Sequence, residues 1–263
     1  MIPLRDENPT LRTPVVTIAL LVILGAVWIF VQGAGLDARA LAASVCNWGM
    51  VPGELTHRAR LGTSVQIGAG MACVVDDEAI NILTPITSMF LHGGWLHLLG
   101  NGLFLWIFGN NIEDSMGRIR FVFFYLICGL VAATAQVLIS PASPVPMVGA
   151  SGAISGVLGA YLVLYPRVRV HVLIILFIFV QVITVPAWMM LIWWFGLQVL
   201  EGLPQLNRLS PDVSAGVAVW AHIGGFASGV LLIKLFKNDR LLDGRRAAPR
   251  VPARGKVWSI VRR

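Results

Sequence analysis

Charged side chains are scarce in this 263-residue chain, in which Asp, Glu, Lys and Arg make up 13% of the residues. Soluble proteins carry roughly 25% charged residues, so the composition excludes an ordinary soluble domain. Apolar residues make up 57% of the chain. Most of them fall in runs close to the roughly 20 residues that a helix needs to cross a bilayer. We therefore predict one all-α polytopic membrane domain.

Features of two other classes are missing as well. Four charged residues lie within the first 12 positions, and the apolar run after them is too long for the central segment of a cleavable signal peptide. We therefore expect the first span to be retained. A small-molecule transporter would need acidic residues along a pathway and inverted repeats, and neither is apparent in the sequence.

Six apolar runs are predicted to span the membrane as helices. They are Pro14 to Gln32, Leu83 to Gly109, Phe121 to Ile139, Pro146 to Tyr165, Pro186 to Leu203 and Val217 to Phe236. Lys and Arg accumulate on the cytoplasmic side of membrane proteins. Six spans place all three basic clusters there: Arg118 with Arg120, Arg167 with Arg169, and the segment after position 237. Both termini are therefore expected in the cytoplasm.

The stretch from Val170 to Val185 is apolar enough to span by itself, but Pro186 interrupts any continuous helix there. A seventh span would move the basic C-terminal segment to the outside, against the charge rule. We interpret this stretch as an interfacial segment that leads into the fifth span, and the sequence leaves open whether it spans.

The predicted organisation is a cytoplasmic N-terminus at 1–13, a membrane domain at 14–236 and a disordered basic cytoplasmic tail at 237–263. The tail carries nine Lys or Arg and two Asp, a surplus equal to the net charge of +7. We interpret the tail as a topology determinant attracted to anionic lipid headgroups, and we predict a lipid bilayer but no nucleic acid as a partner.

The long loop at 33–80 is predicted to lie outside the membrane, and loops of this length are usually functional or flexible. Two of the three cysteines, Cys46 and Cys73, lie in it, whereas Cys128 lies in a predicted span. An external loop permits a disulfide between Cys46 and Cys73, but neither their spacing nor the loop composition demands one.

Ser151 is a polar residue in an apolar run, and polar groups inside a bilayer are costly. It lies in the motif GASGAISG, about five residues below the predicted external boundary and roughly 8 Å deep at about 1.5 Å per residue. One interpretation is helix packing, because Gly152 and Gly156 form a GxxxG contact face. The other is a nucleophilic serine, and this segment alone does not decide between them.

The sixth span opens with AHIGGFASG, in which His222, Gly225 and Gly229 share one helical face. The small residues predict a close neighbouring helix beside His222. Its predicted depth equals that of Ser151, which favours a joint role. A hydrogen-bonded core histidine and half of a metal site are the alternatives.

The second span contains HGGWLHLLGN, which places His97 and Asn101 on one helical face and His92 at the external mouth. Their side chains are hydrogen-bond donors at a similar depth. Metal binding by His92, His97 and His222 is the alternative. The HExxH pattern of zinc proteases is absent, and we predict neither a metal nor a cofactor.

A serine hydroxyl, a histidine and further donors at one depth are the parts needed for acyl transfer. His222 can take the proton of Ser151 and return it to a leaving amine. Asn101 and His97, with the backbone N–H groups at Ser151 and Gly152, can stabilise the oxyanion. No Asp or Glu lies at this depth, so the sequence indicates a catalytic pair rather than a triad.

These motifs, in this order, resemble those of the rhomboid family of intramembrane serine proteases. HGGWLHLLGN matches the family pattern HxxxxHxxxN at His92, His97 and Asn101, GASG places Ser151 at the nucleophile, and AHIGGFASG places His222 at the general base. The turn EDSMGRIRF is similar to the family segment EDxxGxxRF. The resemblance runs over most of the chain. It implies a six-helix bundle with an aqueous cavity open to the outside and a mobile fifth span or cap loop that admits substrate sideways.

We therefore expect an intramembrane serine endopeptidase that cleaves single-span membrane proteins near the external face, in the plasma membrane of a bacterium. His92, Gly149, Gly225 and Gly229 are predicted to support the site. The competing hypothesis is a noncatalytic membrane adaptor that binds transmembrane helices through the same bundle and needs no catalytic serine. The sequence indicates neither the substrate nor the oligomeric state.

Overall fold

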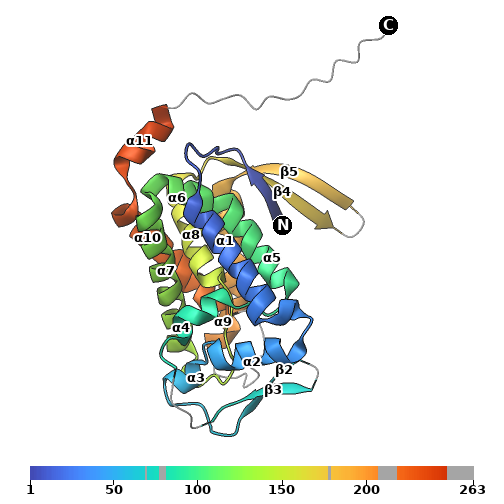
Figure 1. The fold of residues 1–263 in the computed structure, drawn as a ribbon. Coiled ribbons are helices and arrows are strands. Elements are labelled where there is room, and N and C mark those ends of the chain that lie inside the picture. Colours follow the sequence, from blue (N-terminus) through green and yellow to red (C-terminus); the bar gives the residue numbers. More distant parts are fainter. Residues whose placement is uncertain (69, 77–80, 177–178, 207–217, 248–263) are drawn as a thin grey trace.

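The computed structural model describes residues 1–68, 70–76, 81–176, 179–206 and 218–247, and a bundle of helices forms its centre (Figure 1). In chain order the elements are β1 (Ile2–Asp6), α1 (Val15–Ala26), η1 (Val27–Val31), η2 (Gly33–Gly35), α2 (Ala38–Trp48), α3 (Pro52–Leu55), β2 (Ser64–Gly68), β3 (Met71–Val74), α4 (Thr84–Thr87), η3 (Ser88–Phe90), α5 (Trp95–Phe104), η4 (Leu105–Gly109), α6 (Asn110–Met116), α7 (Arg118–Ile139), α8 (Ser151–Leu164), β4 (Arg169–Leu176), β5 (Phe179–Pro186), α9 (Ala187–Leu206), α10 (Val219–Phe236) and α11 (Asp239–Ala247).

The helices α1, α8 and α10 fall within the predicted apolar runs, whereas α7 begins three residues before its run and α9 ends three residues after its run. Of the described helices, α7 and α10 are long and apolar enough to cross a membrane, and α1 with η1 and α8 are shorter apolar helices. The second predicted run differs from a single helix, because 84–90 forms two short turns and α5 begins only at Trp95. The apolar residues of that run therefore do not form one continuous helix.

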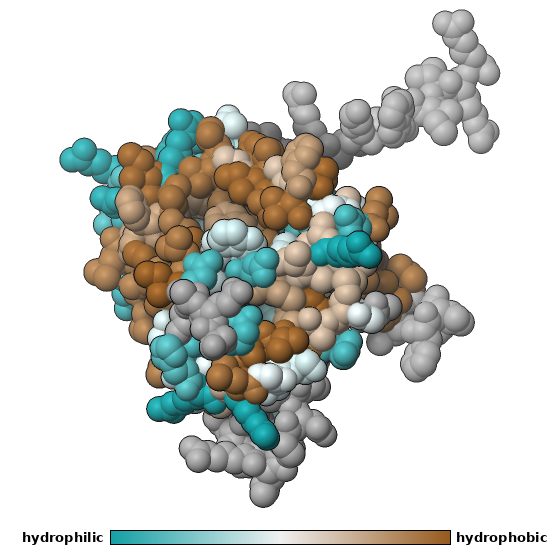
Figure 2. Space-filling view, turned by 60° about the horizontal axis from the view of Figure 1, so that its bottom comes forward, coloured by the Kyte–Doolittle hydropathy of each residue, from teal (hydrophilic) through white to brown (hydrophobic). Residues whose placement is uncertain are grey.

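The outside of the bundle is apolar as well as its core. Phe30 is 83% exposed, Leu231 71% and Leu235 77%. Figure 2, which turns the end carrying α2 and the β2–β3 hairpin toward the viewer, shows broad apolar areas on the surface. Exposed apolar surface of this extent is expected where lipid, and not water, surrounds a protein.

Helix α8 lies inside the bundle, and its nine residues from Ala153 to Tyr161 are all buried. A helix that is apolar on every side is stable only when neighbours cover all of its faces. α7 and α10 pack against it, and Phe108 from η4 contacts Tyr161 edge to face at 4.9 Å between ring centroids. The first residue of α8, Ser151, is therefore held by the most buried part of the fold.

A three-stranded sheet, in the order β1-β4-β5, lies at the end of the bundle that carries the N-terminus (Figure 1). The described residues between Val170 and Val185 therefore belong to two antiparallel strands, β4 and β5, and not to a helix that crosses a membrane. The buried side chains Val170 and Val172 alternate with less buried neighbours, as expected for a strand. Because an open sheet edge has unpaired backbone groups, this hairpin is suited to the end of the bundle and not to the lipid core.

Acidic side chains fasten the N-terminal segment to the same end. Glu113 accepts hydrogen bonds from the backbone N–H groups of Val16 (3.0 Å) and Thr17 (2.8 Å) and from the Thr17 hydroxyl (2.8 Å). These are donors that the first turn of α1 cannot satisfy within the helix. Asp6 accepts hydrogen bonds from Tyr161 Oη at 2.5 Å and from Asn111 Nδ2 at 2.9 Å.

The described residues of the segment 33–80 include α2, α3 and the paired strands β2 and β3, which lie at the opposite end of the bundle (Figure 1). Cys46 and Cys73 form a disulfide that links α2 to β3, which decides the pairing that the sequence left open. Burial and the neighbouring Asp76 carboxylate raise the pKa of Glu54 in this segment above its usual value.

Candidate active site

Ser151 and His222 meet where α8 and α10 begin. Ser151 is the first residue of α8, and His222 is in the first turn of α10. The Ser151 Oγ to His222 Nε2 distance is 2.8 Å, and the histidine is 8% exposed. A serine and a histidine in this arrangement are a nucleophile and a base within hydrogen-bond reach.

Glycines allow the two helices to come this close. A Cβ added at Gly225 would overlap the carbonyl oxygen of Gly152, and one at Gly229 would overlap that of Gly156. The helices therefore touch backbone to backbone along a seam of small residues, as in the close helix pairs of membrane proteins. The seam begins beside the pair, because Gly152 follows Ser151 directly.

Ser151 was predicted to lie about five helical residues below the external boundary, but the structure places it in a different way. Residues 146–150 are not helical, and α8 begins at Ser151 itself, so five helical residues do not separate the serine from the external end. Met147 instead pairs with Met50 in an isolated β-bridge. The extended segment carries the chain inward to the start of α8. This start leaves backbone N–H groups at Ser151 and Gly152 without intrahelical acceptors.

A third helix contributes two side chains that the sequence analysis missed. Gln198 of α9 is 9% exposed, and its Oε1 lies 2.6 Å from His222 Nδ1. Trp194, one turn earlier on α9, has its ring centroid 5.9 Å from that of the imidazole. The signal in the sequence was Gln198 itself, since a polar amide in an apolar run needs a partner.

The predicted oxyanion donors lie beside the residues that precede Ser151. Asn101 is 7% exposed, and its Nδ2 has no hydrogen-bond partner among the described residues. Gly93 N–H donates to His97 Nδ1 at 3.3 Å, which leaves Nε2 as the protonated nitrogen of a neutral ring. A buried donor without a partner is rare in proteins and indicates a site that a ligand completes.

Gly149 permits this approach. Its φ of +126° belongs to a region that side chains disfavour. A Cβ built there would lie 2.6 Å from His97 Nε2 and 3.6 Å from Asn101 Nδ2. Gly149 N–H also donates to the Ser88 carbonyl at 2.8 Å, which fixes the segment. The glycine therefore brings the chain before Ser151 against both predicted donors.

His92 has a structural position behind His97. It is fully buried, its backbone N–H donates to Gln32 Oε1 at 2.8 Å, and its carbonyl accepts from Gln32 Nε2 at 2.8 Å. The His92 and His97 rings meet edge to face with centroids 5.1 Å apart. Within the described part of the chain, no group of three or more His, Cys, Asp or Glu side chains is placed to hold a metal ion.

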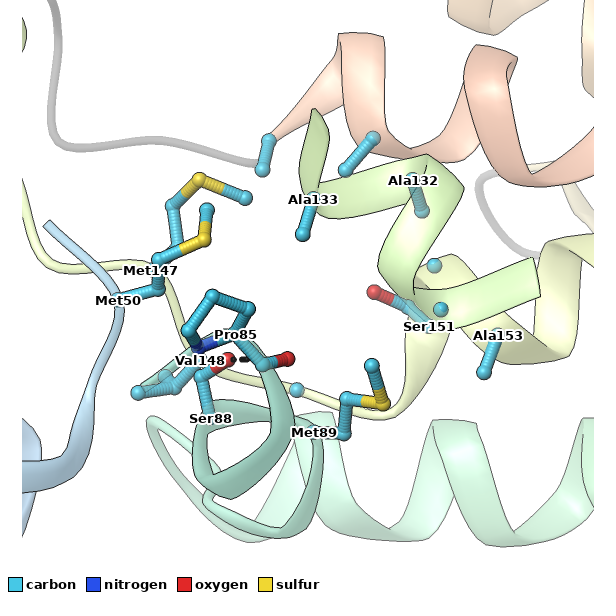
Figure 3. Close-up of a pocket in the computed structure, with 15 residues that line it drawn as sticks. Met50, Pro85, Ser88, Met89, Ala132, Ala133, Met147, Val148, Ser151 and Ala153 are labelled. Atoms are coloured by element: carbon cyan, nitrogen blue, oxygen red, sulfur yellow. Dashed lines mark hydrogen bonds between the residues drawn. The ribbon is translucent and has the colours of Figure 1, made fainter. Parts of the chain in front are cut away.

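A small cavity adjoins Ser151. Its volume is about 40 Å³, enough for a small side chain or a few water molecules. The lining consists mainly of methionine, alanine and glycine: Met50, Met89, Ala132, Ala133, Met147, Gly149, Gly152 and Ala153. Figure 3 shows the Ser151 hydroxyl directed toward the cavity, with Met50 and Met147 across from it.

Comparisons with known proteins agree with the order of these elements. A family model described as the rhomboid domain matches residues 81–238. The chain is 42% identical over 89 residues to the rhomboid protease GluP of Bacillus subtilis, covering 34% of this chain and 16% of that protein. It is 34% identical over 188 residues to RHOMBOID-like protein 4 of Arabidopsis thaliana, covering 69% of this chain and 39% of that protein. The match to Rhomboid-like protease 5 of Toxoplasma gondii is 30% identical over 150 residues, covering 56% of this chain and 15% of the relative. The aligned part is thus less than half of the length of each of these relatives.

Proposed function

The chain belongs to the rhomboid family, and from that premise we propose that it is a serine endopeptidase that cleaves other membrane proteins in or near their membrane spans. The family makes it an integral membrane protein with a helical polytopic fold. One observation carries the proposal for this chain: the 2.8 Å contact between Ser151 Oγ and Nε2 of the buried His222. A noncatalytic adaptor would need no such contact.

In the proposed reaction, Ser151 Oγ attacks the carbonyl carbon of the scissile peptide while its proton moves to His222 Nε2. The negative charge that forms on the carbonyl oxygen is stabilised by Asn101 Nδ2, by His97 Nε2 and by the backbone N–H groups at the start of α8. His222 then returns the proton to the leaving amine. Water, activated in the same way, hydrolyses the acyl-enzyme and restores the serine.

The topology is part of the proposal: six spans within 14–236, cytoplasmic termini, and a basic cytoplasmic tail at 237–263. Two features at opposite ends of the bundle support this topology. The Cys46–Cys73 disulfide lies at one end, and disulfides persist in oxidising, extracytoplasmic compartments. Arg118 and Arg120 lie at the start of α7, toward the other end, as basic residues do on the cytoplasmic side. The site would then open to the external face of a bacterial plasma membrane.

The proposed substrates are single-span membrane proteins. The cavity of about 40 Å³ beside Ser151 favours a small residue next to the scissile bond, because a large side chain would overlap its alanine and glycine lining. Small residues other than alanine, such as glycine and serine, also weaken a substrate helix, which has to unwind before a serine can reach its backbone.

The test compares purified wild type, Ser151→Ala and His222→Ala on a panel of single-span reporters, with cleavage sites mapped by mass spectrometry. Ser228→Ala is the matched control, since this buried serine of α10 donates to Gly225 O in its own helix (2.7 Å) and, among the described residues, forms no hydrogen bond with Ser151 or His222. We expect cleavage by wild type and Ser228→Ala alone. Equal cleavage by all four proteins would refute the assignment, and binding of reporters without cleavage by wild type would favour the adaptor.

A further inference from the structure

The imidazole of His222 is held at both of its nitrogens. Nε2 lies 2.8 Å from Ser151 Oγ, and Nδ1 lies 2.6 Å from Gln198 Oε1. An amide oxygen only accepts hydrogen bonds, so the proton of the neutral ring is on Nδ1. The lone pair on Nε2 therefore faces the serine hydroxyl, which is the arrangement that a general base requires.

We propose that Gln198 is a positioning residue of the reaction: it selects the tautomer of His222 that can accept the proton of Ser151 and fixes the direction of the ring. This inference rests on the proposed serine protease function. Gln198 does not touch the reacting atoms and acts through His222 alone. The site then consists of Ser151, His222 and Gln198, which come from α8, α10 and α9.

An amide is suited to this position in a membrane. In soluble serine proteases a buried carboxylate orients the histidine. A carboxylate here would bring a charge into an apolar bundle, which is far more costly than an amide that has a partner. Gln198 provides the same acceptor geometry without the charge. The sequence contains no Asp or Glu at this depth, and the structure shows an uncharged acceptor in that role.

Trp194 supports the same assignment. It lies on the face of α9 that carries Gln198, since residues four apart share a helix face. Its ring contacts the imidazole with centroids 5.9 Å apart and also packs on Phe226, at 6.1 Å. Gln198 thus fixes the edge of the imidazole while Trp194 packs against the ring.

The test uses Gln198→Met, which keeps the length of the side chain but lacks an acceptor, and Gln198→Glu, which keeps the acceptor. Gln136→Met is the matched control, because Gln136 of α7 is also 9% exposed and, among the described residues, forms no hydrogen bond with Ser151 or His222. We expect Gln198→Met to lower kcat about tenfold with KM unchanged, since one net hydrogen bond of about 1.4 kcal/mol is lost. Gln136→Met should have the wild-type kcat.

Gln198→Glu supplies the readout that a merely structural role would not move. This variant should keep most of the activity that Gln198→Met loses. It should also shift the acidic limb of the kcat/KM profile to higher pH, because a carboxylate favours the protonated imidazole. Wild-type kcat in Gln198→Met, or a pH profile of Gln198→Glu that superimposes on the wild type, overturns the inference. Ser151→Ala separates the two failures: if that variant still cleaves, the proposed function is wrong, whatever Gln198 does.

Discussion

A single methyl group added at Gly225 tests whether the approach of α8 and α10 sets the geometry of the candidate pair. A Cβ at this position overlaps the carbonyl oxygen of Gly152, the residue after Ser151. The obstacle is backbone inside a helix and cannot turn away as a side chain would. The two helices therefore have to separate in Gly225→Ala.

The size of the effect follows from ordinary contact distances. Carbon and oxygen atoms at close helix contacts lie about 3.3–3.6 Å apart, whereas the added Cβ would lie 2.1 Å from the Gly152 oxygen, so the helices have to separate by more than about 1 Å. Such a movement takes the 2.8 Å bond between Ser151 and His222 beyond the range of hydrogen bonds. A misplacement of about 1 Å costs about 100-fold in rate, and we expect kcat to fall by that factor.

The assay is the initial rate of reporter cleavage by purified protein, with melting temperature measured in the same detergent. Gly25→Ala is the matched control, because a Cβ at Gly25 in α1 meets no atom outside its own helix within 4 Å. Both variants gain the helix propensity of alanine over glycine, about 1 kcal/mol, so propensity cannot explain a difference between them. Wild-type kcat in Gly225→Ala would refute the reasoning, and an equal loss in Gly25→Ala would assign the effect to glycine removal in general.

Three further changes have defined outcomes. Asn101→Ala should lower kcat about 100-fold with KM nearly unchanged, because the oxyanion loses a donor; an unchanged kcat in the reporter assay would remove Asn101 from the site. Glu113→Ala should lower the free energy of unfolding by about 3 kcal/mol in a denaturant titration, since it leaves buried donors at the start of α1 unpaired. A loss smaller than that caused by replacing an exposed acidic residue with alanine would contradict this. Glu54→Gln should remove a fall in melting temperature with rising pH. The raised pKa of Glu54 means that the folded protein holds this proton above the usual pKa, so stability is lost as pH rises through the raised pKa. A fall of equal size in the variant would assign it to another group.

The sequence was sufficient to identify the two helices that carry the candidate pair, because each contains a polar residue that an apolar run does not explain. The argument for equal depth led to Ser151 and His222, but it assumed that the helix begins at Pro146, and this premise is wrong. α8 begins at Ser151, since Gly149 with its φ of +126° and Pro146 do not continue a helix backward from the serine. Hydrophobicity along 146–150 reflects burial, and burial alone does not distinguish a helix from an extended segment.

The β-hairpin at 169–186 could not be recognised by the same means. Between Val170 and Val185 the residues are Val, Ile, Leu and Phe apart from His171, Gln181 and Thr184, so neither the helical nor the strand period stands out. Pairing with β1, which is more than 160 residues away in the sequence, is a tertiary contact that the local pattern does not contain. The charge rule correctly argued against a helix there, but it carries no information on which other structure forms.

The contact between Gln198 and His222 depends on the rotation of α9 about its axis, which apolar flanking residues do not fix. Two features determine the hydrogen bond between Ser151 and His222. The glycine seam sets the distance between the two side chains, and Gln198 sets which nitrogen of the His222 ring carries the proton. Because both act on the same bond, their losses should not multiply. We expect Gly225→Ala combined with Gln198→Met to lose about 100-fold in kcat, close to Gly225→Ala alone, and not the roughly 1,000-fold product expected of independent sites. A full product, measured on the same reporter with both singles in parallel, would mean that Gln198 supports activity by a route other than His222.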